Sequence, residues 1–168
     1  NLKYYFIYCN MVGAQDELIF DGRSFIVDNK GKLKSLGKHC DTDVIDFNSS
    51  DHDNKLEVHI NKSKEIFEAL CLGVKDYFNK SGFKKAVIGL SGGIDSALTA
   101  TIAAKSIGYD NVIGISMPSN FSSEHSKSDA KNLADNLGIE FHTIPIHNLY
   151  EEILDNMDIF FKGSPTGL

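Results

Sequence analysis

The sequence predicts an α/β protein with a doubly wound parallel sheet, preceded by a β-rich segment. After residue 60, short apolar runs alternate with segments whose apolar side chains recur every three or four residues. Strands that alternate with helices of about 10–15 residues are typical of βαβ units with a parallel sheet, and right-handed crossovers make such a chain doubly wound. Residues 1–47 contain aromatic and β-branched runs, whereas residues 48–60 are polar and lack a period, as in a linker.

The first 47 residues predict strands joined by turns. Residues 3–9 (KYYFIYC) contain no breaker and predict a buried strand. The glycine and polar side chains of residues 10–16 predict a loop. A hairpin is expected next, with strands over residues 24–28 and 32–36 around the turn sequence DNKG. Residues 43–47 predict a further short strand.

The remainder of the chain predicts four helices and three strands. The helix that follows the linker has apolar side chains at helical spacing and is expected to end at Gly82. Strands are then expected over residues 84–90, 111–117 and 140–146, and helices over residues 95–107, 123–137 and 147–157. Gly108 and Gly138 follow two of these helices, and Ser122 or Ser123 suits the N-cap of the second.

Composition and charge narrow the class of protein. The 168 residues are 42% hydrophobic and 24% charged, the balance of a folded domain, and the net charge of −6 argues against a nucleic-acid binder. No apolar run approaches the roughly 18 residues of a membrane-spanning helix. Three widely spaced cysteines form no disulfide framework, so we expect a cytoplasmic protein with Cys9 as a buried side chain. Because residue 1 is Asn, we expect the chain to be a piece of a longer polypeptide.

One segment carries the residues expected to bind a ligand, and it joins the first parallel strand to a helix: Gly89, Leu90, Ser91, Gly92, Gly93, Ile94, Asp95 and Ser96. Open α/β sheets bind ligands at such junctions. The two central glycines let the backbone approach a ligand, and the N–H groups and dipole of the helix favour phosphate. The hydroxyl groups of Ser91 and Ser96 are expected to add donors. A carboxylate beside phosphates requires a cation between them, so Asp95 implies Mg²⁺.

The spacing of this motif matches neither a Walker A loop nor GxGxxG. SGGIDS after a strand resembles instead the pyrophosphate loop of the N-type ATP pyrophosphatases, which split ATP between its α and β phosphates. Residues 72–146, including MPS and SSEHS at residues 117–126, closely resemble the synthetase domain of the glutamine-dependent NAD⁺ synthetase family. Residues 10–25 resemble the end of that family's nitrilase-type glutaminase domain, although the family more often has Gly in place of Ala14 and Arg23.

The resemblance implies a fold and a domain organisation. Residues 1–47 would be the C-terminal part of the nitrilase-like glutaminase domain, a β-rich remnant of an α-β-β-α sandwich. After the linker over residues 48–60, residues 61–168 would be the N-terminal part of an ATP-pyrophosphatase domain with an adenine nucleotide alpha hydrolase-like, Rossmann-like fold.

The resemblance also implies a reaction. The family amidates deamido-NAD⁺ to NAD⁺ through an adenylylated intermediate, using ATP, Mg²⁺ and ammonia from glutamine, and releases AMP and pyrophosphate. Position and resemblance place Met117 and Pro118 against the adenine, with a plain core role as the alternative for Met117. We expect the glutaminase nucleophile and the deamido-NAD⁺ contacts to lie outside this chain, which then holds no catalytic residue of its own. The whole protein is expected to be a homo-oligomer with small-molecule partners, bound to neither nucleic acid nor membrane.

Two alternatives stay open at this stage. The first is another enzyme with the same loop, such as GMP synthetase, a tRNA-modifying thiolase or lysidine synthetase. The nitrilase-like segment argues against all of these, and the acidic charge argues against the tRNA enzymes. The second is a non-catalytic nucleotide-binding module, although Asp95 beside two glycines suits pyrophosphate release better. His39, His52 and His59 lack the spacing of metal ligands.

Overall fold

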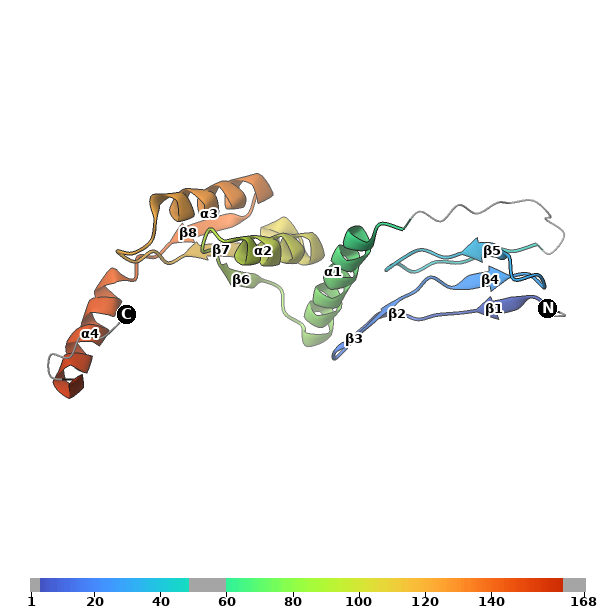
Figure 1. Ribbon diagram of the computed structural model, residues 1–168, viewed down its shortest axis with the longest axis horizontal. Helices are drawn as coiled ribbons and strands as arrows, with labels where there is room; N and C mark the ends of the chain where they lie inside the picture. Colours follow the sequence, from blue (N-terminus) through green and yellow to red (C-terminus); the bar gives the residue numbers. More distant parts are fainter. Residues whose placement is uncertain (1–3, 49–59, 162–168) are drawn as a thin grey trace. The chain divides into compact units, whose positions relative to one another are not determined.

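The computed structural model describes residues 4–48 and 60–161 of the chain (Figure 1). The chain divides into two compact units, Asn1–Phe83 and Lys84–Leu168. Most of the expected linker, together with His52 and His59, lies outside the described residues. Within the described residues, no helix combines the length and the apolar character that crossing a membrane requires.

The first unit contains two antiparallel sheets. Strands β1 (Phe6–Tyr8), β4 (Phe25–Val27) and β5 (Leu33–Leu36) form one sheet in the order β1-β4-β5, and β2 (Val12–Gln15) pairs with β3 (Leu18–Asp21) in the other. The predicted β4–β5 hairpin is confirmed. Its turn is held by Asp28, whose carboxylate accepts the N–H groups of Lys30 and Lys32 at 2.9 Å each.

Three expectations for this unit are wrong. Residues 10–16 are not a loop, because β2 pairs with β3 around the two-residue turn Asp16-Glu17. Residues 43–47 form no strand. There the carboxylate of Asp43 accepts the N–H groups of Lys38 and Val44 at 3.0 and 2.9 Å, and such local bonds compete with strand pairing.

The third error concerns the burial of the first strand. Phe6, Ile7 and Tyr8 are 47%, 66% and 44% exposed, and Cys9 is exposed as well. The physical reason is the position of β1 at the edge of its sheet, where it pairs only with β4. The absence of breaker residues in KYYFIYC was therefore a correct sign of a strand but not of burial.

Helix α1 (Lys62–Ser81) packs on the β2–β3 hairpin. Asn61 caps it by accepting the N–H of Lys64 at 3.1 Å, and it ends at Gly82 in the left-handed conformation, as predicted. The carboxylate of Asp76 accepts the N–H of Ala14 at 2.8 Å. The ammonium of Lys80 donates to the Ala14 carbonyl, so one β2 residue is held by two residues of α1.

The second unit is built on a three-stranded parallel sheet, which confirms the predicted α/β class. Strands β6 (Ala86–Gly89), β7 (Val112–Ser116) and β8 (Glu140–Thr143) lie in the order β6-β7-β8. Helix α2 (Ile94–Ile107) connects β6 to β7 with a short 3-10 turn (Tyr109–Asn111), and α3 (Glu124–Leu137) connects β7 to β8 (Figure 1). Helix α4 (His147–Phe161) runs four residues beyond its predicted end.

Alanine residues bring α2 and α3 close to the sheet. The core of the unit is Leu90, Ala100, Ala103, Ala104, Val112, Ala130, Ala134 and Ile139, all less than a tenth exposed. Small side chains on both helices allow close approach, and the two helices also contact each other. This packing fixes the first turns of α2 and α3 beside the carboxyl ends of β6 and β7.

Candidate nucleotide-binding site

The expected strand-to-helix junction is present in the second unit. Strand β6 ends at Gly89, and the N–H of Leu90 still bonds to the Ile115 carbonyl of β7 at 2.8 Å. The chain then turns over residues 91–93 and enters α2, with Gly93 as the N-cap. The loop over residues 90–93, called here the β6–α2 loop, therefore lies at the carboxyl edge of the sheet, where α/β proteins bind ligands.

The two serine hydroxyl groups of the motif hold this loop together. The hydroxyl of Ser96 donates to the Gly93 carbonyl at 2.9 Å, and the N–H of Gly93 donates to the Ser91 hydroxyl oxygen at 3.2 Å. Because the Ser96 proton is used in this way, the 3.1 Å bond between the two hydroxyls takes its proton from Ser91. Both hydroxyls thus bond to groups within the loop and the first turn of α2, and the expectation that they donate to a ligand stays a prediction.

The N-terminus of α2 is open to an anion. Gly93 gives this helix no side-chain cap, in contrast to Asn61 of α1 and Ser123 of α3. The N–H groups of a helix's first turn have no acceptor inside the helix, and here no side chain replaces one. Ile94, Asp95 and Ser96 form that turn, which leaves backbone donors and the positive end of the helix dipole for a ligand.

Asp95 is the second residue of α2 and its side chain is exposed. Among the residues that the structure describes, no cationic side chain pairs with its carboxylate. A lone carboxylate in a helix turn that could bind phosphate could also hold Mg²⁺, which protein sites commonly bind through one or two carboxylates, phosphate oxygens and water. The described part of the chain has no cluster of three or more His, Cys, Asp or Glu side chains that could hold a metal without a ligand's oxygens.

Gly92 brings the β6–α2 loop against the first turn of α3. Its φ is +83°, and a Cβ placed there would lie 2.3 Å from the carbonyl oxygen of Ser126 and 2.7 Å from its Cα. Only glycine permits this approach between two backbones. The loop and the start of α3 therefore form one continuous wall.

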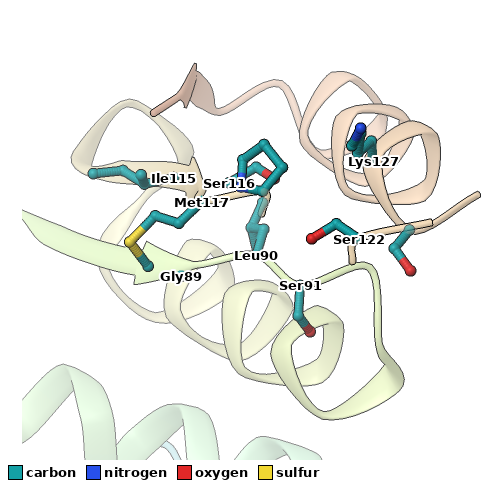
Figure 2. Close-up of a pocket in the computed structure, with 10 residues that line it drawn as sticks. Gly89, Leu90, Ser91, Ile115, Ser116, Met117, Ser122 and Lys127 are labelled. Atoms are coloured by element: carbon teal, nitrogen blue, oxygen red, sulfur yellow. The ribbon is translucent and has the colours of Figure 1, made fainter. Parts of the chain in front are cut away.

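A cleft of about 250 Å³ opens between these elements (Figure 2). Five predicted residues line it, namely Gly89, Leu90, Ser91, Met117 and Pro118. The other five predicted residues, Gly92, Gly93, Ile94, Asp95 and Ser96, do not line it and lie in the adjoining loop and helix turn. Met117 is 53% exposed, which excludes a plain core role for this residue within the unit.

Sequence reasoning did not single out the other half of the lining as site residues: Ile115, Ser116, Ser122, Ser126 and Lys127. One sequence signal could have identified these residues, namely the hydroxyl-rich segment that follows β7. The carboxyl ends of neighbouring parallel strands meet at one edge of the sheet, so this segment is expected near the β6–α2 loop. Ser123 organises this segment by accepting the N–H of Ser126 at 3.1 Å as the N-cap of α3. The Lys127 ammonium lies 2.8 Å from a Glu124 carboxylate oxygen, and this bond lowers the pKa of Glu124.

His39 lies in the first unit and has close polar neighbours. Its Nδ1 is 3.1 Å from the Glu68 carboxylate, and its Nε2 is 3.5 Å from the Cys40 sulfur. The order Glu68, His39, Cys40 resembles a thiol activated by a histidine. However, the pKa of Cys40 is raised, mainly by burial and to a lesser extent by the negative charge of Asp21. A raised pKa disfavours the thiolate, so this arrangement packs α1 against the preceding segment rather than activating a nucleophile.

Comparison with known proteins identifies relatives of this chain. Residues 66–160 match the family model described as NAD synthase. The glutamine-dependent NAD(+) synthetase of Synechocystis is 42% identical over 96% of this chain and 30% of its own length, and that of Thermotoga maritima is 37% identical over 93% and 34%. The chain thus spans about a third of the length of these curated relatives.

Solved structures give the same picture. Glutamine-dependent NAD⁺ synthetase from Acinetobacter baumannii, in complex with ADP, superposes with a TM-score of 0.90 at 33% identity, covering 96% of this chain and 32% of that chain. NMN synthetase from Francisella tularensis has a TM-score of 0.56 at 34% identity, covering 60% of this chain and 42% of that one. Since the family model covers more than half of its residues, the chain belongs to the NAD synthase family.

Proposed function

We propose that the whole protein that carries this chain converts deamido-NAD⁺ to NAD⁺ by ATP-dependent amidation, with ammonia taken from glutamine. The observation that carries the proposal is the uncapped N-terminus of α2 beside a cleft at the carboxyl edge of the sheet, in a member of the NAD synthase family. Support comes from the ADP-bound relative, whose fold matches nearly all of this chain. The names of the curated relatives supply the nitrogen donor and the product.

The reaction needs ATP because a carboxylate does not react with ammonia unaided. A carboxylate oxygen of the nicotinate ring attacks the α-phosphorus of ATP, the bond to the bridging α–β oxygen breaks, and pyrophosphate leaves. Ammonia then adds to the carbonyl carbon of this mixed anhydride. The carbon–oxygen bond to AMP breaks, AMP leaves with the electron pair, and a proton is lost from nitrogen.

Residues of this chain would position the nucleotide and the leaving pyrophosphate. The backbone N–H groups of the first turn of α2 meet the phosphates, while Met117 and Pro118 contact the adenine at the end of β7. Asp95 would hold Mg²⁺, which supplies charge neutralisation for the departing pyrophosphate. Positioning and charge stabilisation of this kind account for much of the catalysis of phosphoryl and adenylyl transfer.

The proposal extends to the assembly and its location. Strand β6 lies at one edge of the three-stranded sheet, and Val87 within it is 63% exposed. An exposed apolar edge strand favours pairing or coverage by another polypeptide. We therefore propose that the whole protein is a homo-oligomer. The cytoplasmic location is proposed from the three cysteines, all of which lie in the described part of the chain and form no disulfide there.

The test is an assay of the purified whole protein with ATP, Mg²⁺, deamido-NAD⁺ and either glutamine or ammonium. NAD⁺, AMP and pyrophosphate should form in equal amounts, and omission of Mg²⁺ should abolish them. Asp95→Asn should keep the fold and lower kcat/KM for ATP by at least about tenfold, since even the outer-shell partners of metals are worth that much. The matched control is Asp110→Asn. Asp110 is an exposed carboxylate just before β7, at the amino end of that strand and so away from the carboxyl ends where the cleft lies.

Two results would contradict the proposal. Equal activity of the Asp95 and Asp110 variants would show that Asp95 does not hold the metal. ATP cleavage without NAD⁺ formation would show that deamido-NAD⁺ is not the substrate. The nicotinate mononucleotide should then be tested, because one structural relative is an NMN synthetase.

A further inference from the structure

Lys127 contributes the charge of the cleft. It is the one charged residue among the ten that line this cleft in the described part of the chain. Figure 2 shows it on α3, on the same side of the cleft as Ser122. Its side chain is 39% exposed and so only partly withdrawn from water, and together with Glu124 it also lines a neighbouring cleft.

The ion pair between Lys127 and Glu124 is weak. The Nζ–Oε1 distance is 2.8 Å, but the Glu124 side chain is 89% exposed. Ion pairs of such exposure contribute little to stability, because water and salt screen them and two flexible side chains must be ordered. A phosphate group, with up to two negative charges and several acceptor oxygens, competes well for the ammonium.

The geometry of the β6–α2 loop brings a phosphate within the neighbourhood of Lys127. Gly92 of that loop lies against the backbone of Ser126, which is the residue before Lys127. Ser91 of the loop and Lys127 of α3 line the same cleft. A nucleotide that runs from Met117 to the N-terminus of α2 therefore passes along the wall that the loop and the first turn of α3 form together, and Lys127 lies on that wall.

We propose that Lys127 is a phosphate-binding residue that exchanges its Glu124 partner for the phosphate chain of ATP when the nucleotide occupies the cleft. This inference rests on the proposed function. Its consequence is selective: Lys127 adds affinity for the triphosphate and none for adenosine. Glu124 acts as a competing partner, so removing its charge strengthens ATP binding.

The experiment compares four variants of the whole protein by the KM and kcat for Mg-ATP and by the Kd for adenosine. Lys127→Met should raise the KM for ATP about fivefold, as for a partly exposed charge-assisted bond, with kcat and the adenosine Kd unchanged. Lys127→Arg should restore the KM to within about twofold. Glu124→Gln should lower the KM by up to about twofold.

Lys131→Met is the matched control. Lys131 lies one turn further along α3 and pairs with Asp135 at 2.6 Å, but it does not line this cleft. Its variant should match the unaltered protein. An equal KM in the Lys127→Met and Lys131→Met variants overturns the inference alone, as does a parallel loss of adenosine affinity. Failure of the unaltered protein to consume ATP would overturn the proposed function together with it.

Discussion

Gly92→Ala tests the contact between the β6–α2 loop and α3, on which the geometry of the cleft depends. The added Cβ would lie 2.3 Å from the Ser126 carbonyl oxygen, and the obstructing atoms belong to the backbone, so no side chain can rotate away. A non-glycine residue at a φ of +83° costs about 1 kcal/mol, and overpacking of this kind costs about 1–3 kcal/mol more. We expect the free energy of unfolding to fall by about 2–4 kcal/mol in total.

The measurement is urea unfolding followed by far-UV circular dichroism, with Gly138→Ala as the control. Gly138 lies in the same unit at a φ of +68°, but a Cβ there meets no atom within 4 Å. Its substitution carries the backbone cost alone, about 1 kcal/mol, and the difference between the two variants isolates the steric part. Equal losses in both variants would show that the loop and α3 do not approach as described. Gly92→Ala should also weaken ATP binding, because relief of the clash displaces one wall of the cleft.

Three further predictions follow from local features. Ser123→Ala should lower the free energy of unfolding by about 1 kcal/mol in the same assay, through loss of the N-cap bond to Ser126, and no change would refute the cap. Because burial raises the folded pKa of Cys40, its alkylation by iodoacetamide should reach half-maximal rate at a higher pH in the folded protein than in the urea-unfolded protein, and the stability that it contributes should be lost as pH rises above about 8.5; mass spectrometry of the Cys40 peptide across pH measures this, and coincident profiles in the two states would contradict it. The 168-residue chain should self-associate in sedimentation through its exposed β6 edge, whereas a monodisperse monomer would show that this edge is covered.

The elements best predicted from the sequence are those specified by local chemistry. The cap at Ser123 and the turn at Asp28 depend on side chains that bond to backbone groups only a few residues away. Helical periodicity located α1 and α3 for the same reason. The β2–β3 hairpin was missed because Gly13 and Asp16 look like loop residues, and only pairing of Val12 with Asp21 makes a strand of them. Pairing is a property of two segments, which one segment's composition does not reveal.

The residues of the candidate site also divide into those that local sequence could predict and those that it could not. The β6–α2 loop could be identified from SGGIDS because its glycines, helix start and carboxylate are consecutive in the sequence. Ser122, Ser126 and Lys127 join it only through packing of α3 beside α2, which depends on the buried alanines of both helices. The bonds that Ser91 and Ser96 make with each other and with Gly93 were not predicted, since hydroxyl orientation depends on neighbours brought close by the turn.

A chain with a net charge of −6 can still bind a polyanion, because the charges that matter lie within a few ångströms of it. At physiological ionic strength the Debye length is about 8 Å, so distant exposed carboxylates are largely screened. Near the cleft the structure places the uncapped N-terminus of α2, the start of α3 and the Lys127 ammonium, all of positive character. Asp95 and Glu124 are the local exceptions: a divalent cation converts Asp95 from a repulsive group into an anchor, and Glu124 is paired with Lys127. The net negative charge therefore disfavours nonspecific binding of polyanions without weakening a site that acts at contact distance.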